Sequence, residues 1–305
     1  MQRVVDKLVA AIGTVLIGKD EQIRLALACL FAHGHLLIED LPGMGKTSLA
    51  QALARVLGLS YNRIQFTSDL LPADILGVSV YDRHAGQFEF HPGPVFSQLL
   101  LADEINRTTP KTQSALLEAM GEGQVTVEGE TRALPRPFFV IATQNPVHQS
   151  GTYPLPESQL DRFLMRIELG YPDPSSERAL LSGVDPRTRL VDMKPLLNPE
   201  QLLKIQQQVT RIKASESLVD YLQRLVQFTR DEPLFQCGLS PRGALATLQC
   251  ARAWALIQGR QYVIPEDVQA VFPAATAHRL RGAGEFAGQH SALLVQRVLN
   301  AVDVL

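Results

Sequence analysis

The chain has 305 residues, of which 46% are hydrophobic and 20% are charged. This composition is typical of a globular protein with a full core, and the length favours about two domains. The formal net charge of −2 gives no support for wholesale binding to nucleic acid or to an anionic membrane, and leaves room only for local basic loops. The longest uninterrupted apolar run, Leu25–Ala32, falls far short of the ~18 residues that a membrane-spanning helix needs.

The amino-terminal residues and the cysteines both favour a cytoplasmic protein. Charges at Arg3, Asp6 and Lys7 interrupt the apolar start of the chain, so the apolar core of a signal peptide is missing. The cysteines are few, odd in number and set in apolar helical contexts, and we expect inert core thiols in a reducing compartment. They are Cys29, Cys237 and Cys250.

Apolar residues at helical spacing open the chain, over Val4–Leu16 and Glu21–Ala32. Strand candidates then alternate with helical stretches. The strand candidates are Leu36–Glu39, Tyr61–Phe66, Leu99–Ala102, Phe138–Thr143 and Arg166–Leu169. This alternation predicts an α/β fold, in which a parallel five-stranded sheet is covered by helices on both faces.

Two short segments within this α/β part predict β-hairpins. Apolar residues alternate with polar ones from Val78 to Phe90 around an Arg83–Gly86 turn. A similar pattern runs over Gln124–Leu134 around Glu128–Glu130. These hairpins are either loop decoration or projections toward a molecule on which the protein acts, and the sequence leaves both interpretations open.

A proline-rich stretch, Tyr171–Pro174, ends the alternation, and only helices are expected from about Pro199 onward. The expected helices are Glu200–Lys213, Ser217–Arg230, Pro241–Gln258, Pro265–Leu280 and Ser291–Val304. We therefore predict an α/β domain over residues 1–172, a linker over residues 173–198 and an all-α domain over residues 199–305.

A phosphate-binding loop is predicted at Leu41–Ser48, which reads Leu-Pro-Gly-Met-Gly-Lys-Thr-Ser. It follows a predicted strand and opens a helical stretch, which is the context that a triphosphate site requires. Gly43 and Gly45 allow backbone N–H groups to turn toward the phosphates, and Lys46 reaches the β- and γ-phosphates. The hydroxyl of Thr47 is suited to coordinate Mg²⁺.

Two carboxylates follow a second predicted strand, in Leu99–Glu104. Asp103 is suited to hold Mg²⁺ through water, and Glu104 to polarise an attacking water. The general loop pattern has glycine at position 40, where this chain has Asp40. Both segments nevertheless lie at the carboxyl ends of predicted parallel strands, where such folds bind ligands, so ATP hydrolysis is the favoured function.

Three further polar residues are candidates for the same site. Asn145 follows a predicted strand and is suited to orient water beside a γ-phosphate, although asparagine before proline is also a common turn residue. Arg162 is predicted on a short helix, where a surface ion pair with Asp161 or Glu157 is the alternative. Arg242 falls in the first turn of a helix capped by a serine, where a cation opposes the helix dipole, so a nearby triphosphate explains it better than helix stability does.

The order of these motifs resembles that of AAA+ ATPases, specifically the MoxR group, over nearly the whole chain. The strings that carry the resemblance are Leu-Ile-Gly-Lys at 16–19, Pro-Gly-Met-Gly-Lys-Thr at 42–47, Ala-Asp-Glu-Ile-Asn-Arg at 102–107, Pro-Lys-Thr-Gln at 110–113, Ala-Thr-Gln-Asn-Pro at 142–146, Tyr-Pro-Leu-Pro-Glu-Ser-Gln-Leu-Asp-Arg-Phe at 153–163 and Leu-Ser-Pro-Arg at 239–242. An acidic residue such as Asp40 is familiar at its position in MoxR-like chains. The resemblance implies an AAA+ core followed by an α-helical lid, with the hairpins as the family's two insertions.

The resemblance also implies roles for single residues. Lys46 and Thr47 would bind phosphate and Mg²⁺, Asp103 would organise the ion and Glu104 would activate water. Asn145 would be the first sensor, Arg242 the second, and Arg162 the finger inserted into the site of a neighbouring subunit. Leu16, Ile17 and Gly18 would form the adenine pocket, and the remaining loop contacts would come from Pro42, Gly43, Met44, Gly45 and Ser48. Arg107 lies in a matching string without an assigned role.

Members of this family form hexameric rings and are thought to remodel or mature protein complexes, often with a von Willebrand factor A-domain partner. The resemblance thus implies a Mg²⁺-dependent ATPase acting on a protein client. One alternative is an ATP-dependent assembly switch with incidental turnover, which would not need Glu104, Asn145 and Arg162 together. Another is a nucleic-acid motor, which the net charge and the acidic second hairpin disfavour. A transcription activator is weaker still, because no Gly-Ala-Phe-type loop is present.

Overall fold

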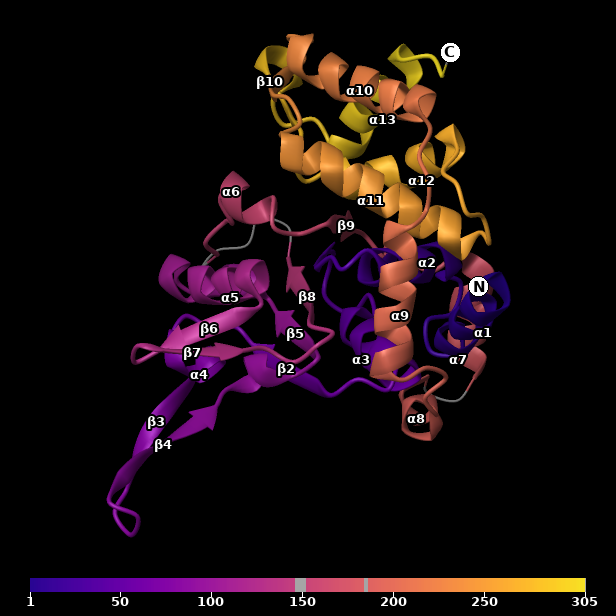
Figure 1. Cartoon of the computed structure of the whole chain (residues 1–305). Helices are drawn as coiled ribbons and strands as arrows, with labels where there is room; N and C mark the ends of the chain where they lie inside the picture. Colours follow the sequence, from indigo (N-terminus) through magenta and orange to yellow (C-terminus); the bar gives the residue numbers. More distant parts are fainter. Residues whose placement is uncertain (146–151, 184–185, 305) are drawn as a thin grey trace.

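The computed structural model describes residues 1–145, 152–183 and 186–304. Figure 1 shows an α/β body from which a helical domain and a long hairpin extend in different directions. The helices are α1 (Gln2–Gly13), α2 (Asp20–Phe31), α3 (Lys46–Val56), α4 (Pro72–Leu76), α5 (Pro110–Glu122), α6 (Glu157–Leu160), α7 (Pro174–Ser182), α8 (Pro186–Asp192), α9 (Pro199–Thr210), α10 (Glu216–Asp231), α11 (Pro241–Ile257), α12 (Pro265–Thr276) and α13 (Ser291–Ala301). The strands are β1 (Leu36–Glu39), β2 (Tyr61–Gln65), β3 (Gly77–Asp82), β4 (Gln87–Pro92), β5 (Leu99–Asp103), β6 (Gln124–Val127), β7 (Glu130–Ala133), β8 (Phe139–Gln144), β9 (Met165–Ile167), β10 (Phe235–Cys237) and β11 (Arg281–Gly282).

The central sheet has five parallel strands in the order β2-β5-β8-β1-β9, which confirms the predicted fold class. All five predicted strands are present, with ends shifted by at most two residues. The register places Gln65 of β2 opposite Asp103 of β5, and Thr143 of β8 opposite Ile38 of β1. The carboxyl ends of four strands therefore meet at one edge, beside the loop that follows β1.

Alternation along β5 explains why helices cover both faces of this sheet. Leu99 and Leu101 point into a hydrophobic cluster with α1, α2 and α3, whereas Leu100 and Ala102 point into a second cluster with α4 and α5. The buried imidazole of His35 strengthens the second layer, because Nδ1 accepts a hydrogen bond from the Val140 N–H at 3.0 Å and Nε2 contacts the Met120 carbonyl at 3.2 Å. Burial lowers the pKa of His35 to about 4 and keeps the ring neutral.

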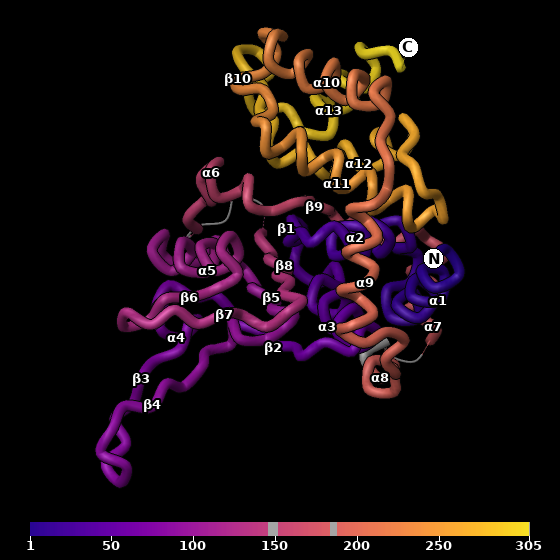
Figure 2. Tube along the Cα trace, viewed as in Figure 1, coloured from indigo at the N-terminus to yellow at the C-terminus, as the bar shows by residue number. Residues whose placement is uncertain are grey.

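Both predicted hairpins are present. Strands β3 and β4 pair antiparallel and project away from the body, and β6 and β7 pair beside α5 (Figures 1 and 2). The guanidinium of Arg132 on β7 lies 3.9 Å from the centroid of the Phe90 ring on β4, which links the two hairpins. Tyr81 and Phe88 pair edge to face near the tip of the β3–β4 hairpin, and both are exposed.

In the carboxyl-terminal domain, α10 to α13 lie above the α/β body in the view of Figure 2, and α9 runs down beside that body. Two details of the sequence interpretation were wrong here. A short antiparallel ladder of β10 and β11 interrupts the expected run of helices. Cys237 lies on β10 and is exposed, whereas Cys29 and Cys250 are buried as expected. Strand β10 belongs to a ladder of only two short strands, and the Cys237 side chain on it is not covered by other residues.

Helix α9 joins the two domains by packing on α2, and its Gln206 side chain donates a hydrogen bond to the Leu30 carbonyl at 2.8 Å. A second connection comes from Arg279, which follows α12. Its Nε donates to Asp161 Oδ1 at 2.7 Å and its Nη2 donates to the Phe163 carbonyl at 2.7 Å. Within the described part of the chain, no helix is long and apolar enough to cross a bilayer.

Candidate active site

The predicted phosphate loop connects β1 to α3, and its conformation depends on two glycines. Gly43 has φ +88° and Gly45 has φ +92°, a left-handed region that residues with a Cβ rarely adopt. Helix α3 begins directly at Lys46, so the loop ends on the helix amino terminus. Backbone N–H groups there are free of helical partners and suit an anion.

A cavity of about 630 Å³ opens in front of this loop. Its lining includes twelve of the predicted site residues: Leu16, Ile17, Pro42, Gly43, Met44, Gly45, Lys46, Thr47, Ser48, Asp103, Glu104 and Asn145. The polar members come from the loop and the strand ends. Apolar members come from the turn after α1 and from Pro42 and Met44 of the loop, and Tyr171, Pro172 and Leu180 add to them from the segment after β9. The cavity thus has a polar end and an apolar side.

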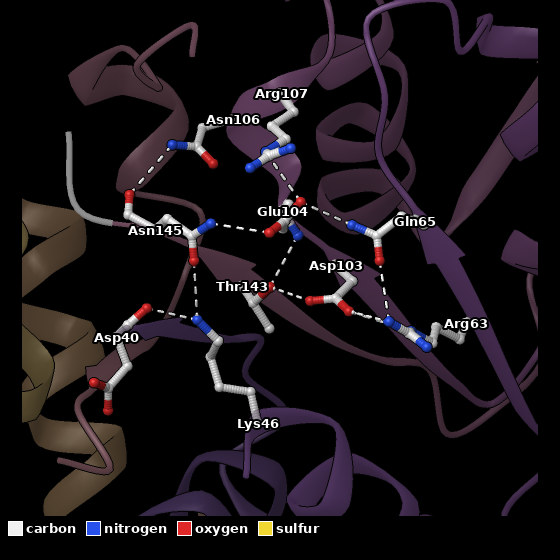
Figure 3. A network of polar contacts seen from close by, with 10 residues as sticks. All are labelled: Asp40, Lys46, Arg63, Gln65, Asp103, Glu104, Asn106, Arg107, Thr143 and Asn145. Atoms are coloured by element: carbon white, nitrogen blue, oxygen red, sulfur yellow. Dashed lines mark hydrogen bonds and ion pairs between the residues drawn. The ribbon is translucent and has the colours of Figure 1, made fainter. Parts of the chain in front are cut away.

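Lys46 is buried, and its ammonium group contacts only neutral oxygens among the described residues. Nζ donates to the Asp40 carbonyl at 2.6 Å and to Asn145 Oδ1 at 3.2 Å (Figure 3). Burial lowers the pKa of Lys46, and the nearby carboxylates of Asp40, Asp103 and Glu104 oppose that shift. A partly desolvated cation of this kind would gain strongly from a phosphate oxygen.

The carboxylate of Asp103 lies between two donors at the end of β5. Thr143 Oγ1 donates to Oδ1 at 2.5 Å, and Arg63 Nη2 donates to Oδ2 at 2.7 Å (Figure 3). The hydroxyl of Thr143 also accepts a hydrogen bond from the Glu104 N–H at 2.9 Å. Thr143 therefore fixes both acidic residues relative to β8.

Glu104 has φ +57°, which is unusual for a residue with a side chain and marks it as a constrained position. Two side chains donate hydrogen bonds to its carboxylate, and a third forms an ion pair with it. Asn145 Nδ2 donates to Oε1 at 2.9 Å, Gln65 Nε2 donates to Oε2 at 2.9 Å, and Arg107 Nε lies 3.0 Å from Oε2 (Figure 3). The predicted base and the predicted first sensor are thus in direct contact. Pro146, which follows Asn145 in the sequence motif, lies outside the described residues.

Sequence reasoning missed Arg63, Gln65 and Thr143 and left Arg107 without a role. The first two lie on β2, where they alternate with the buried Ile64 and so face the same side. That alternation was visible in the sequence, but only the pairing of Gln65 with Asp103 shows that β2 adjoins β5. The order of the strands in the sheet cannot be predicted from the spacing of residues along the chain.

The oxygen atoms that line this cavity are suited to coordinate a Mg²⁺ ion bound together with a nucleotide. Thr47 and Asp103 supply oxygen atoms to the same space, and Mg²⁺ usually takes only one or two protein ligands beside phosphate oxygens and waters. Within residues 1–145, 152–183 and 186–304, no group of three His, Cys, Asp or Glu side chains could hold a metal on its own. A Mg²⁺ ion here would compete with Arg63 for Asp103.

Gly18 does not line the cavity. A Cβ at this position would lie 2.2 Å from Ser176 Oγ near the start of α7, and the glycine has φ +73°. The residue therefore allows the turn that carries Leu16 and Ile17 to pack directly against α7. Its contribution to a nucleotide site is through the position of that turn.

Arg162 and Arg242 lie together in a second cavity, of about 430 Å³, and not in front of the phosphate loop. Arg242 is in the first turn of α11, where Ser240 Oγ caps the helix by accepting from the Gly243 N–H at 3.0 Å. Arg162 Nη1 donates to the Leu117 carbonyl at 2.6 Å. The alternative partners considered for Arg162 are engaged elsewhere, Asp161 with Arg279 and Glu157 with Arg281.

This second cavity is strongly cationic. Arg252 and Arg279 also line it, whereas Asp161 is the one acidic residue among its described lining. Asp161 is paired with Arg279, so Arg162, Arg242 and Arg252 have no carboxylate partner within the described chain. Guanidinium groups without carboxylate partners in one cavity favour the binding of an anion supplied from outside the subunit.

Comparison with known proteins agrees with this geometry. Residues 35–165 match the ATPase family associated with various cellular activities (AAA), and residues 227–298 match the AAA lid domain. The chain is 47% identical to the uncharacterized protein YeaC of Bacillus subtilis, over 98% of this chain and 94% of that protein. It is 41% identical to the chaperone MoxR1 of Mycobacterium tuberculosis, over 90% of this chain and 75% of that protein.

A crystal structure of a candidate ATPase from Cytophaga hutchinsonii superposes with a TM-score of 0.89 at 37% identity, covering 99% of this chain and 95% of that one. The core and lid matches, the relatives and the superposed structure all indicate one family. The chain belongs to the MoxR group of AAA+ ATPases.

Proposed function

We propose that the protein is a Mg²⁺-dependent ATPase, and the observation that carries this proposal is the cavity that joins the phosphate loop to Asp103, Glu104 and Asn145. Lys46 and the loop N–H groups would bind the β- and γ-phosphates, and Thr47 and Asp103 would hold Mg²⁺, which neutralises phosphate charge when bound. Glu104 would take a proton from the attacking water, which Asn145 orients. Leu16 and Ile17 would contact the adenine.

The second, cationic cavity supports the proposal that the active form is a ring, by family resemblance a hexamer. Arg162 and Arg242 are held away from their own phosphate loop, so a γ-phosphate could reach them only from a neighbouring subunit. Hydrolysis would then depend on assembly, because transition-state charge is stabilised only when the neighbour docks.

We further propose that hydrolysis drives remodelling or maturation of a protein client in the cytoplasm, with a von Willebrand factor A-domain protein as partner. The relative named as a chaperone supports a protein client. The alternative of an ATP switch with incidental turnover is disfavoured because a switch would not need Glu104, Asn145 and Arg162 together, and the first two are in contact at 2.9 Å. A nucleic-acid motor is disfavoured because the second hairpin carries Glu128 in its turn and Glu130 at the start of β7.

The direct test is phosphate release from ATP. We expect turnover that requires Mg²⁺ and stops when the metal is chelated. Lys46→Ala should remove nucleotide binding itself, because the loop loses the cation that meets the β- and γ-phosphates. Arg55→Ala, on the same helix and without a role in the cavity lining, is the matched control. Undiminished ATP binding by the Lys46 variant would refute the proposed site.

The β3–β4 hairpin is proposed to contact the client. Its apolar side chains are exposed although ATP chemistry does not need them, including Val78, Val80, Tyr81 and Phe88. Replacing Asp82–Gln87 by a two-residue turn should leave basal ATPase near normal and impair ATP-dependent protection of a chemically denatured test protein against aggregation. Full protection by the shortened protein would show that the hairpin is decoration, and loss of ATPase would show that it supports the core.

A further inference from the structure

Asp40 occupies the position where the general phosphate-loop pattern has glycine. Both oxygens of its carboxylate accept hydrogen bonds from backbone N–H groups. Oδ2 accepts hydrogen bonds from two consecutive backbone groups, the N–H of Leu169 at 2.7 Å and the N–H of Gly170 at 2.7 Å. Oδ1 accepts from the N–H of Leu41 at 2.8 Å. A single side chain therefore ties the start of the phosphate loop to the chain that leaves β9.

The tethered segment forms part of the cavity wall. Gly170, Tyr171 and Pro172 all line the nucleotide cavity, beside the turn that carries Leu16 and Ile17. Lys19 from that turn donates to the Tyr171 carbonyl at 2.7 Å, so the two apolar parts of the wall are also joined. Gly170 has φ +62°, a conformation that glycine adopts easily, and the chain turns there before Tyr171 and Pro172.

The backbone of the same residue contacts the phosphate end of the site. The carbonyl of Asp40 accepts from Lys46 Nζ at 2.6 Å, and its N–H donates to the Gln144 carbonyl at 3.3 Å, one residue before Asn145. Asp40 thus has one set of bonds to the phosphate-binding groups and another to the apolar wall. Glycine in this position would keep the backbone bonds to Lys46 and Gln144 and lose the carboxylate bonds to Leu169 and Gly170.

We propose that Asp40 is a positioning residue that fixes the wall formed by Gly170–Pro172 against the phosphate loop, and thereby sets affinity for the nucleoside part of the ligand. This inference rests on the proposed function, in which a nucleoside triphosphate fills the cavity. The triphosphate itself meets the loop glycines and Lys46 Nζ, and the Asp40 carboxylate makes no hydrogen bond to either. Removing that side chain should weaken binding of ATP selectively.

The experiment compares Mg²⁺·ATP with Mg²⁺·tripolyphosphate by titration calorimetry on the full chain. For Asp40→Gly we expect ATP affinity to fall about tenfold, the size of effect expected when a hydrogen-bonded charged anchor is lost, and tripolyphosphate affinity to change less than about twofold. Asp40→Asn, which retains one acceptor oxygen, should lie between Asp40→Gly and the unsubstituted protein. Asp74→Asn is the matched control, because the Asp74 carboxylate also accepts a backbone N–H, at 2.8 Å from Leu71, outside the cavity.

The outcomes separate this inference from the proposed function. Equal losses for ATP and tripolyphosphate would mean that Asp40 serves the phosphate loop alone, and unchanged ATP affinity would mean that it serves neither; both results overturn the inference and leave the ATPase proposal standing. Failure of the unsubstituted protein to bind either ligand would overturn the proposed function and the inference with it. A selective loss of ATP affinity in both Asp40 variants, absent in the Asp74 control, supports the inference.

Discussion

Glu104→Gln should bind ATP with normal affinity and lose turnover by roughly 10²–10⁴-fold, the usual contribution of a general base. The amide has nearly the same shape as the carboxylate but cannot accept the proton of the attacking water. Asn145 Nδ2, which donates to Glu104 Oε1 at 2.9 Å, can donate equally well to the amide oxygen, so the contact between these two residues should persist. Nucleotide affinity and steady-state phosphate release, measured on the same preparation, check this expectation.

The neighbouring residues provide the control for this variant. Gln65 donates to the other oxygen of Glu104 and Arg107 forms an ion pair with it, and neither can act as a base. Gln65→Ala should therefore change turnover far less than Glu104→Gln does. Turnover by the Glu104 variant at the rate of the unsubstituted protein would show that another group activates the water.

Arg162→Ala should bind ATP normally and lose hydrolysis by roughly 10³-fold or more, as expected when an arginine that stabilises the transferring phosphoryl group is removed. The side chain lies in the cationic cavity with Arg242 and is absent from the lining of the phosphate-loop cavity. ATPase per subunit of the unsubstituted protein should accordingly rise with protein concentration as rings form. Arg211 is an exposed arginine outside both cavities, and Arg211→Ala should change neither quantity.

Much of the fold follows from local sequence signals. The strand that reads Leu-Leu-Leu-Ala is buried on both faces, as an uninterrupted apolar run predicts for a parallel sheet. The capping serine and the proline before Arg242 fix the start of α11 at the predicted residue. The phosphate loop was recognisable because its glycines must adopt positive φ.

Other parts of the site could not be read from the chain. Arg63 meets Asp103 only because β2 and β5 are neighbours, which is decided by packing of the whole sheet. Arg242 was expected near a triphosphate, but its distance from the loop depends on how the helical domain docks. That docking rests on long-range contacts such as Arg279 with Asp161, between residues 118 apart in sequence.

The central claim is that each hydrolysis site is shared between two copies of the chain, and mixing two inactive variants tests it most directly. Lys46→Ala lacks a working loop and Arg162→Ala lacks the finger, so either protein alone should be inactive. Mixed rings would contain some junctions where an intact loop meets an intact finger. ATPase should therefore reappear in the mixture, peak at an intermediate ratio and fall toward zero at either extreme. No recovery at any ratio, together with equal specific activity of the unsubstituted protein at all dilutions, would contradict the claim and place the complete site within one subunit.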